Sequence, residues 1–156
     1  MSFQTAVDLI IRQEGGEIVT DDPRDPGGLT KFGISQRAYP ALDIRALTRG
    51  EAEALYRKDY WDKVKGDSLP APLALCVFSC AVNMGCDKAT RLLQRALSVQ
   101  VDGILGVNTL SVANRTGGAV ARFCAEWALA YTGIRNFDLY GRGWLRRVME
   151  TALEAK

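Results

Sequence analysis

The sequence predicts a mostly α fold of the α+β kind, with a helical body and one small irregular or β-containing lobe near the N-terminus. Apolar side chains recur along most of the 156 residues with the period of an amphipathic helix. One segment departs from this pattern, because residues 17–34 are dense in Asp, Pro and Gly, which favours consecutive turns or a short hairpin. The length suits one compact domain, and no repeat or low-complexity linker divides it.

The first predicted helix covers residues 2–16. Ser2 is a suitable N-cap, and Ile10 belongs to an apolar stripe at helical spacing. Glu14 is the next position on this stripe, and Gly15-Gly16 end the helix. Burial and the negative end of the helix dipole should both raise the pKa of Glu14. A carboxylic acid that keeps its proton near neutral pH suits general-acid catalysis, whereas a fraying helix end would simply turn Glu14 outward.

Two more elements are expected before the middle of the chain. Ser35 can cap a short helix that stops before Pro40. Thr48 and Glu51 form a capping box for a helix that runs to about Lys63.

The remaining chain predicts helices throughout. Residues 73–84 are apolar almost all round, which indicates a buried central helix that ends at Gly85. Four further helices are expected to begin at the caps Asp87 and Asn108, after the break Thr116-Gly117-Gly118, and near Gly143.

The composition excludes several kinds of chemistry. Histidine is absent, which removes Ser-His-Asp and Cys-His arrangements and any His-ligated metal. The four cysteines form no CxxC pair, and Cys76 and Cys80 on the central helix are interpreted as buried free thiols. The formal net charge is +2, and a cationic group at 142–147 is explained equally by a solvated helix face and by an anionic partner. We therefore expect no metal, no cofactor and no nucleic-acid partner, with carboxylates carrying any acid–base chemistry.

The sequence also indicates where the chain is made. Its first residues lack the basic region and apolar core of a signal peptide. The longest apolar run, 73–82, is far shorter than a membrane span. We expect a monomer made in the cytoplasm without a signal peptide and not embedded in a membrane.

Paired carboxylates suggest glycosidic-bond hydrolysis. This reaction needs an acid that protonates the leaving oxygen and a second carboxylate that activates water or stabilises the oxocarbenium-like state. Glu14 supplies the first, and the following loop offers Asp21, Asp22 and Asp25 for the second. Both Asp22 and Asp25 precede a proline, so each also suits the start of a turn.

These residues lead to a family resemblance. Glu14-Gly15-Gly16 followed by the segment 25–34, Asp-Pro-Gly-Gly-Leu-Thr-Lys-Phe-Gly-Ile, resembles the signature of glycoside hydrolase family 108. The resemblance continues through 60–64, Leu69-Pro70, Phe78 with 81–85, Leu93-Gln94, 101–106, Phe137, Gly143-Trp144 and Arg147.

The resemblance implies a single lysozyme-like domain over residues 1–156. Residues 1–86 would form the catalytic lobe and central helix, and 87–156 a helical half that resembles a predicted peptidoglycan-binding region. The implied activity is that of a phage endolysin, an N-acetylmuramidase that cleaves peptidoglycan between N-acetylmuramic acid and N-acetylglucosamine. A holin-type partner would release the enzyme from the cytoplasm to the cell wall.

The resemblance also assigns roles to particular residues. Glu14 matches the catalytic glutamate, Asp25 the aspartate of the Asp-Pro-Gly-Gly motif, and Thr30 the threonine after it. The same order of Glu, Asp and Thr is similar to that of phage lysozymes, in which Asp and Thr hold the attacking water. The spacings differ, so Asp22 remains a rival of Asp25.

Other positions are candidates for substrate binding. Tyr60 and Trp61 could stack on sugar rings, although large aromatic side chains at helical spacing commonly belong to the core. Asn83 needs a partner for its amide, which is either a substrate acetamido group or a nearby backbone carbonyl. The segment 94–109 resembles a peptidoglycan-binding motif, and its Asp-Gly pair equally suits a tight turn.

Two alternative functions remain open from the sequence. A lytic transglycosylase would act on the same bond with one acid/base carboxylate, and a non-catalytic peptidoglycan-binding module would need neither carboxylate.

Overall fold

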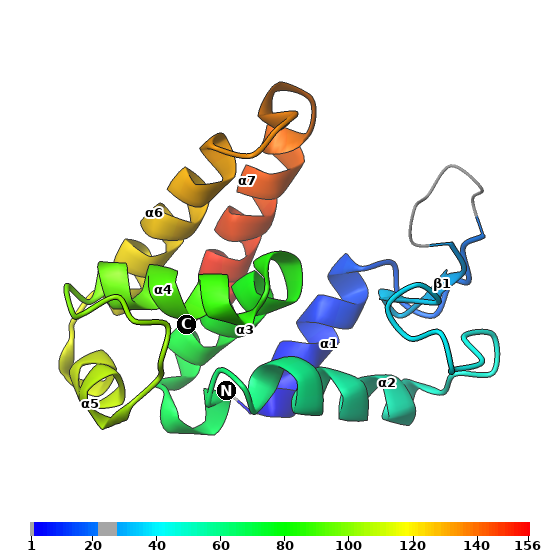
Figure 1. Cartoon of the computed structure of the whole chain (residues 1–156), viewed down its shortest axis with the longest axis horizontal. Coiled ribbons are helices and arrows are strands. Elements are labelled where there is room, and N and C mark those ends of the chain that lie inside the picture. The colour runs from blue at the N-terminus through cyan, green and yellow to red at the C-terminus, as the bar shows by residue number, and fades with distance from the viewer. Residues whose placement is uncertain (1, 22–27) are drawn as a thin grey trace. The chain divides into compact units, whose positions relative to one another are not determined.

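The computed structural model describes residues 2–21 and 28–156. Within these residues it contains seven α-helices and one two-stranded antiparallel sheet (Figure 1). The predicted mostly helical α+β fold is therefore confirmed. The chain forms two compact units, Phe3–Asp59 and Tyr60–Lys156, and the small sheet belongs to the first.

Helix α1, Phe3–Gln13, buries the predicted stripe and ends in a Schellman motif. The Gly16 N–H donates to the Ile11 carbonyl at 2.8 Å, and the Gly15 N–H to that of Arg12 at 3.5 Å. Both glycines have positive φ, and the motif requires this of Gly15, the residue after the C-cap. Glu14 is thus the C-cap residue, and its own N–H still reaches the Ile10 carbonyl at 2.9 Å. The backbone on both sides of the candidate acid is fixed by hydrogen bonds.

Strands β1, Thr30–Lys31, and β2, Ile34–Ser35, form a hairpin with a two-residue turn. The turn residues Phe32 (φ 54°) and Gly33 (φ 77°) both have positive φ, as a type I′ turn requires. Thr20 bridges to Thr30 on the other side of β1, so this strand is paired along both edges.

The helix predicted after Ser35 is wrong, and the segment forms turns instead. The Ser35 hydroxyl still accepts the Ala38 N–H at 3.3 Å, so the capping interaction exists. Ser35 is also the last residue of β2, and the Gln36 side chain amide donates to three carbonyls of the following loop, at Tyr39, Pro40 and Leu42. These bonds hold the loop in a compact non-helical form.

Helix α2, Arg49–Tyr56, carries the predicted capping box. The Glu51 carboxylate accepts the Thr48 N–H at 2.8 Å, and the Thr48 hydroxyl accepts the Glu51 N–H at 3.3 Å. A π-helical turn η1, Arg57–Trp61, continues α2, close to the predicted end at Lys63.

The unit Tyr60–Lys156 is built around α3, Ala71–Met84, which follows the 3₁₀ turn η2, Gly66–Ser68. Nine consecutive residues of α3, 73–81, are buried, and the helix ends at Gly85, where φ is 86°. The predicted buried central helix is confirmed. Its thiols Cys76 and Cys80 are buried and free, and the Cys76 sulfur lies 3.8 Å from that of Cys124.

Four more helices follow α3 in this unit; α4, α6 and α7 pack against α3, and α6 and α7 lie side by side in antiparallel directions (Figure 1). Their bounds are α4 Cys86–Ala96, α5 Val107–Arg115, α6 Ala119–Thr132 and α7 Phe137–Glu154. The break before α6 was predicted correctly. The predicted caps Asp87 and Asn108 are wrong. Gly85 and Gly106 hold the N-cap positions of α4 and α5, and no side chain makes a capping hydrogen bond at either helix.

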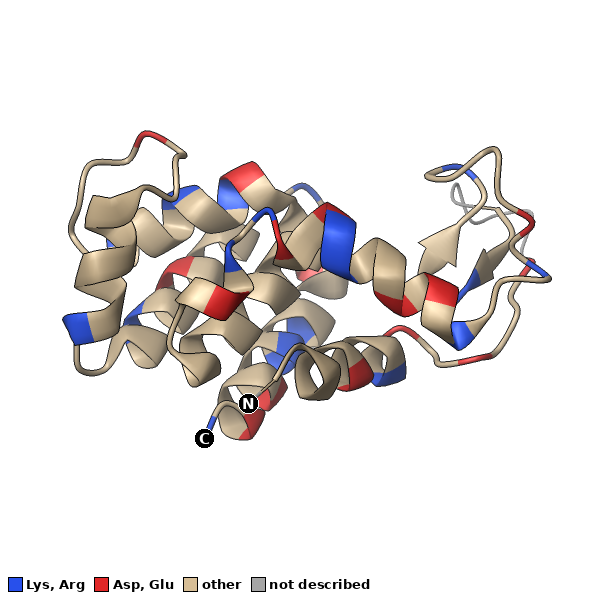
Figure 2. Cartoon of the chain, turned by 90° about the horizontal axis from the view of Figure 1, so that it is seen from below, with Lys and Arg blue, Asp and Glu red and all other residues tan. Residues whose placement is uncertain are grey.

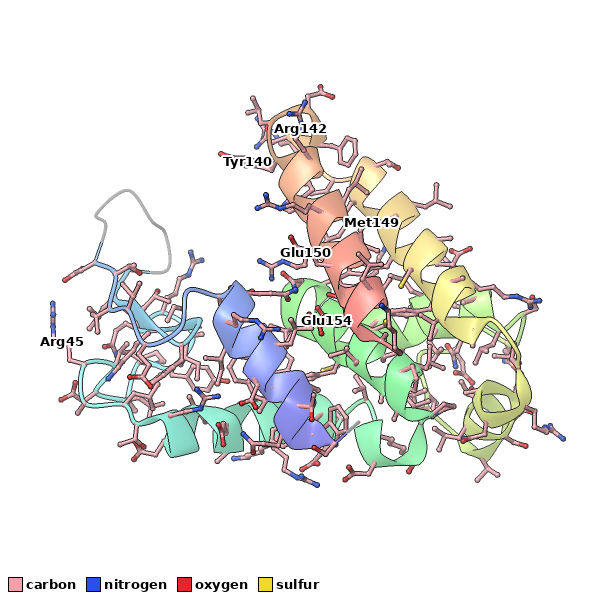
Figure 3. All side chains as sticks on the ribbon, turned by 180° about the vertical axis from the view of Figure 1, so that it is seen from behind. Arg45, Tyr140, Arg142, Met149, Glu150 and Glu154 are labelled. Atoms are coloured by element: carbon pink, nitrogen blue, oxygen red, sulfur yellow. The ribbon has the colours of Figure 1, made fainter. Side chains whose placement is uncertain are left out.

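Helix α7 begins six residues before the predicted start at Gly143. Two glycines in its first half weaken the helical signal in the sequence. One of them is required by packing, since a Cβ at Gly141 would lie 2.6 Å from the Phe137 ring. Tyr140 and Arg142 extend from this first half, and Met149, Glu150 and Glu154 from the second (Figure 3). Acidic and basic residues are interspersed over the helices rather than gathered by sign (Figure 2).

Candidate active site

Glu14 is positioned by the end of α1. The stripe before it is buried, with Val7 and Ile10 both 0% exposed, which anchors the helix in the core of its unit. Glu14 itself is half-buried. The predicted role of Glu14 as the catalytic acid stays a prediction.

The tip of the β1–β2 hairpin lies against the stem of Glu14. A Cβ at Gly33 would stand 2.7 Å from the Glu14 Cβ and 2.9 Å from its Cγ. No real side chain tolerates such distances, so only glycine permits the hairpin to approach this closely. The hairpin therefore forms one wall beside the first two side-chain carbons of Glu14.

Tyr56 of α2 fixes the same turn from a third element. Its hydroxyl donates to the Phe32 carbonyl at 2.9 Å in a buried position, and it would lie 2.6 Å from a Cβ at Gly33. The Phe32 N–H donates to the Gly16 carbonyl at 3.0 Å. These bonds, with the buried Phe32 ring, hold a bulky residue at positive φ, which is strained without such support. The hairpin thus lies against Glu14 at the end of α1, and Tyr56 of α2 fixes the hairpin turn.

Thr30 lies in β1 of the same unit. It exchanges two backbone hydrogen bonds of 2.9 Å with Thr20, and its hydroxyl donates to the Gly28 carbonyl at 3.0 Å. The hydroxyl oxygen keeps acceptor capacity beyond that bond. The predicted role of Thr30 in holding water stays a prediction.

The candidates for the second carboxylate are placed only in part. Asp21 is exposed and pairs with Arg45 at 2.8 Å, and Arg45 points outward from its loop (Figure 3). Asp22 and Asp25 lie outside the described residues. Asp25 and its rival Asp22 therefore both remain candidates for the second carboxylate.

Tyr60 and Asn83 belong to the unit Tyr60–Lys156. Tyr60 lies half-buried on the π-helical turn. Its neighbour Trp61 is a core residue, 3% exposed, edge-on to the Phe78 ring at 5.4 Å, and its indole N–H donates to Asp67 at 2.9 Å. Trp61 therefore packs in the core, whereas the contribution of Tyr60 to substrate binding stays a prediction.

The amide of Asn83 has protein partners on both atoms. Its nitrogen donates to the Ser79 carbonyl at 2.8 Å, and its oxygen accepts from Arg147 at 2.6 Å. Asn83 is exposed. The backbone carbonyl foreseen as one possible partner is present, and Arg147 is a second one that the sequence did not indicate.

The segment 94–109 is organised by one buried side chain, Gln94. Its amide oxygen accepts the Gly103 N–H at 2.8 Å, while its nitrogen donates to Asp102 at 2.6 Å and to the Ile104 carbonyl at 3.0 Å. The Ile104 N–H and Gln94 together hold the pKa of Asp102 below its usual value. The turn interpretation of the Asp-Gly pair thus describes the structure, and a binding role for residues 87–156 stays a prediction.

Two residues of the site were missed by sequence reasoning, Gly33 and Tyr56. Gly33 belongs to the quoted family signature, but a conformational role was not assigned to it. The signal that could have found it is the two-residue Phe-Gly turn between short β-prone segments, because such turns favour glycine at positive φ. The contact with Glu14 depends on tertiary structure.

Within residues 2–21 and 28–156, no group of acidic or sulfur ligands could hold a metal ion. No helix in this part of the chain is both long enough and apolar enough to span a membrane.

Comparisons with known proteins identify a family and a similar solved structure. The model of the family Glycosyl hydrolase 108 matches residues 7–85, a span that includes Glu14, Gly33 and Tyr56. The solved structure of Brucella abortus SagA is similar to the chain, with a TM-score of 0.86, 31% sequence identity, and coverage of 98% of this chain and 92% of that one. No curated protein matches.

Proposed function

Because the chain belongs to the glycosyl hydrolase 108 family, and is accordingly a peptidoglycan hydrolase, we propose that it is an N-acetylmuramidase with Glu14 as its general acid. The bond cleaved would be that between N-acetylmuramic acid and N-acetylglucosamine. The observation that carries the proposal is the close approach of Gly33 to Glu14. This contact holds the side-chain stem of a carboxylic acid in place within the region that the family model matches.

The chemistry that Glu14 would perform follows from its position. Its carboxyl group donates a proton to the glycosidic oxygen as the bond from that oxygen to C1 of the muramyl sugar breaks. A water oxygen then adds to C1 and gives its proton to the second carboxylate or back to Glu14. Proton transfer of this kind depends on precise placement, and the backbone bonds at Glu14, together with the hairpin wall, supply it.

Asp25 is our proposal for the second carboxylate, on the match to the family motif, and Asp22 is the rival. Either would activate the water or stabilise the oxocarbenium-like state, the second role that two-carboxylate hydrolysis needs.

The experiment measures release of reducing ends from purified peptidoglycan. Glu14→Gln should abolish release with an unchanged circular dichroism spectrum, whereas Glu17→Gln, a nearby exposed glutamate, should behave like the parent protein. Asp25→Asn should lower the rate more than Asp22→Asn. Full activity in Glu14→Gln would refute the proposal.

Mass spectrometry of the products tests the reaction type. A muramidase leaves reducing N-acetylmuramic acid ends, whereas a lytic transglycosylase leaves anhydromuramyl ends that are lighter by one water. Anhydromuramyl ends as the main product would replace hydrolysis with transglycosylation at the same Glu14. Binding to insoluble peptidoglycan without any product would support a binding module instead.

The resemblance to endolysins further supports release by a holin-type partner, because peptidoglycan lies outside the cytoplasmic membrane. Expressed alone in a Gram-negative host, the protein should lyse the cells only after chloroform is added. Spontaneous lysis that a secretion inhibitor blocks would contradict this route.

A further inference from the structure

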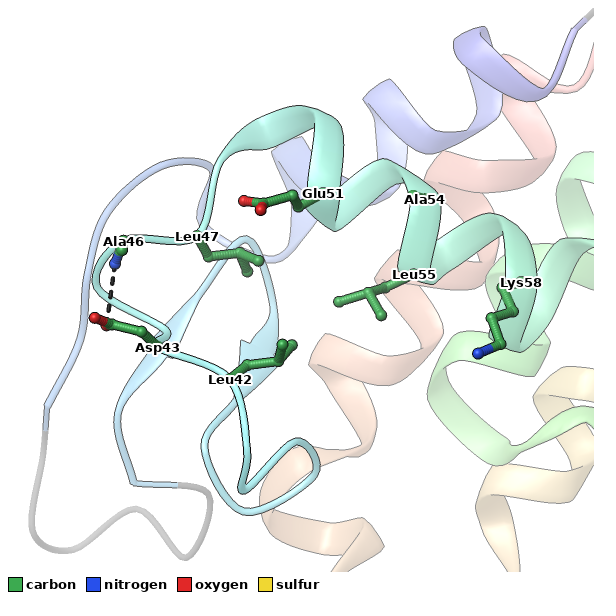
Figure 4. A pocket seen from close by; sticks show the side chains of 8 residues that line it. All are labelled: Leu42, Asp43, Ala46, Leu47, Glu51, Ala54, Leu55 and Lys58. Carbon is green, nitrogen blue, oxygen red and sulfur yellow. Dashed lines mark hydrogen bonds between the residues drawn. The ribbon is translucent and has the colours of Figure 1, made fainter.

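A second concave site lies in the unit Phe3–Asp59, beside α2. It is a pocket of about 400 Å³ between one face of α2 and the loop at residues 42–47, which is within the size range of small-ligand sites. The leucine side chains of Leu42, Leu47 and Leu55 face its interior (Figure 4). This apolar middle is a surface that would gain from being covered.

The pocket uses a different face of α2 from the one that supports Glu14. On this side the pocket is lined by Glu51, Ala54 and Leu55 of α2, which share one helix face, and by Lys58 of the π-helical turn η1 that continues α2. Tyr56, which holds the hairpin turn, is on the buried face with Ala52. The pocket is therefore separate from the candidate active site, although the same helix carries both.

The loop that forms the other wall is held in place before any ligand arrives. The Gln36 amide donates to the Leu42 carbonyl at 2.8 Å. The Lys31 ammonium donates to the carbonyls of Arg45 at 3.1 Å and Leu47 at 2.8 Å. Both side chains tie the loop back to the β1–β2 hairpin. A preformed wall reduces the entropy that binding would otherwise cost.

One end of the pocket is acidic. Glu51 accepts the Thr48 N–H and hydroxyl through one oxygen at 2.8 and 2.7 Å, and these bonds lower the pKa of Glu51 and keep it ionised. Asp43 accepts the backbone N–H groups of Arg45 and Ala46 through one oxygen, as the dashed line to Ala46 in Figure 4 shows in part. The second oxygen of each carboxylate has no partner among the described residues.

The other end is basic. Lys58, on the π-helical turn η1, lines the pocket at the opposite end from Glu51 (Figure 4). Within residues 2–21 and 28–156 its ammonium has no hydrogen-bond or ion-pair partner. The Asp43 carboxylate points toward Ala46 and away from the three leucines (Figure 4). The pocket thus presents the Glu51 carboxylate, an apolar middle and the Lys58 ammonium in a row.

We propose that this pocket binds the peptide stem of peptidoglycan, with the ammonium of a diamino-acid side chain at Glu51 and a stem carboxylate at Lys58. The aliphatic part of the diamino acid would cover the leucines. A fatty acid matches less well, because its tail would end beside the Glu51 carboxylate. The inference rests on the proposed function for its choice of ligand, and it adds a peptide site to a glycan-cleaving enzyme.

The test is direct binding of soluble stem peptides, without glycan, to the full chain with Glu14→Gln. Methyl resonances of Leu42, Leu47 and Leu55 should shift on titration with a tripeptide of alanine, γ-linked glutamate and a diamino acid. Lys58→Glu should weaken binding about fivefold, because an exposed charge pair contributes up to about 1 kcal/mol. Arg37→Glu, an exposed cation of the same unit, should leave it unchanged.

Chemical blocking assigns each end of the ligand. Acetylating the side-chain amine or amidating the carboxylates of the peptide should each weaken binding to the parent protein. The Lys58→Ala variant should bind the amidated and the unmodified peptide equally, because the ammonium that recognises the carboxylate is absent. Unshifted leucine methyls, or equal binding to Lys58→Glu and the parent protein, would overturn the proposal. Binding of decanoate but not of the peptide would overturn it in favour of an anionic amphiphile. None of these outcomes depends on cleavage, so failure of the muramidase proposal would be seen separately.

Discussion

Replacing Gly33 with alanine should separate the placement of Glu14 from the stability of the fold. The new Cβ would lie 2.7 Å from the Glu14 Cβ, about 0.7 Å short of the 3.4 Å at which ordinary contact begins. The Glu14 stem or the hairpin must therefore move by nearly 1 Å. A misplacement of that size in a catalytic group can cost about 100-fold in rate, so we expect kcat to fall by about that factor.

The stability cost of Gly33→Ala has two sources. A non-glycine residue at positive φ costs about 1–2 kcal/mol, and overpacking adds about 1–3 kcal/mol. We expect a loss of about 2–5 kcal/mol in urea unfolding. Gly118→Ala is the matched control, because Gly118 has φ 71° with no atom within 4 Å of the added Cβ, so it should show the backbone strain alone.

The assay is release of reducing ends by folded protein, at a temperature well below the unfolding transition of the variant. Gly33→Ala should be nearly inactive there, and Gly118→Ala fully active. If Gly33→Ala kept more than half of the parent rate while unfolding as early as predicted, the hairpin would not position Glu14 and the reasoning would fail.

Tyr56→Phe should cost about 1–3 kcal/mol in urea unfolding, because the buried Phe32 carbonyl loses its donor; an unchanged midpoint would contradict this. Asp102→Asn should be less stable than the parent at pH 6, because the pKa of Asp102 is lowered in the folded state. That difference should disappear as pH falls below about 3.9, the unfolded value, through the folded pKa. Cys76 and Cys80 should resist a disulfide reagent at pH 8 until urea is added: the Cys124 contact and burial raise the pKa of Cys76, and burial raises that of Cys80.

Local signals predicted the elements whose cause is local. The capping box at Thr48 and the apolar run that became α3 each contain their explanation within a few residues, and both were confirmed. The start of α7 was missed because the reason for Gly141 is the Phe137 ring, which helix propensity does not include. The caps of α4 and α5 were displaced because glycines took the N-cap positions that polar residues usually hold.

In the candidate site, too, the local feature was predicted and the tertiary contacts were not. Glu14 could be found from the sequence, since its stripe and the glycines behind it are contiguous. The residues that surround it could not be predicted. Gly33, which lies against the Glu14 stem, and Tyr56, which holds the hairpin turn, are 19 and 42 positions further along the chain. Hydrophobic periodicity reports which face of an element is buried, but not which element covers it.

The three tryptophans are unevenly distributed, and this affects how the protein can be followed in solution. Trp61, Trp127 and Trp144 all belong to the unit Tyr60–Lys156, where Trp144 stacks on Tyr131 at 5.2 Å. The unit Phe3–Asp59, which carries Glu14, contains none. Intrinsic tryptophan emission is therefore a spectroscopic reporter of one unit alone. A sample could lose the lobe that holds its acid while its emission spectrum still describes a folded protein.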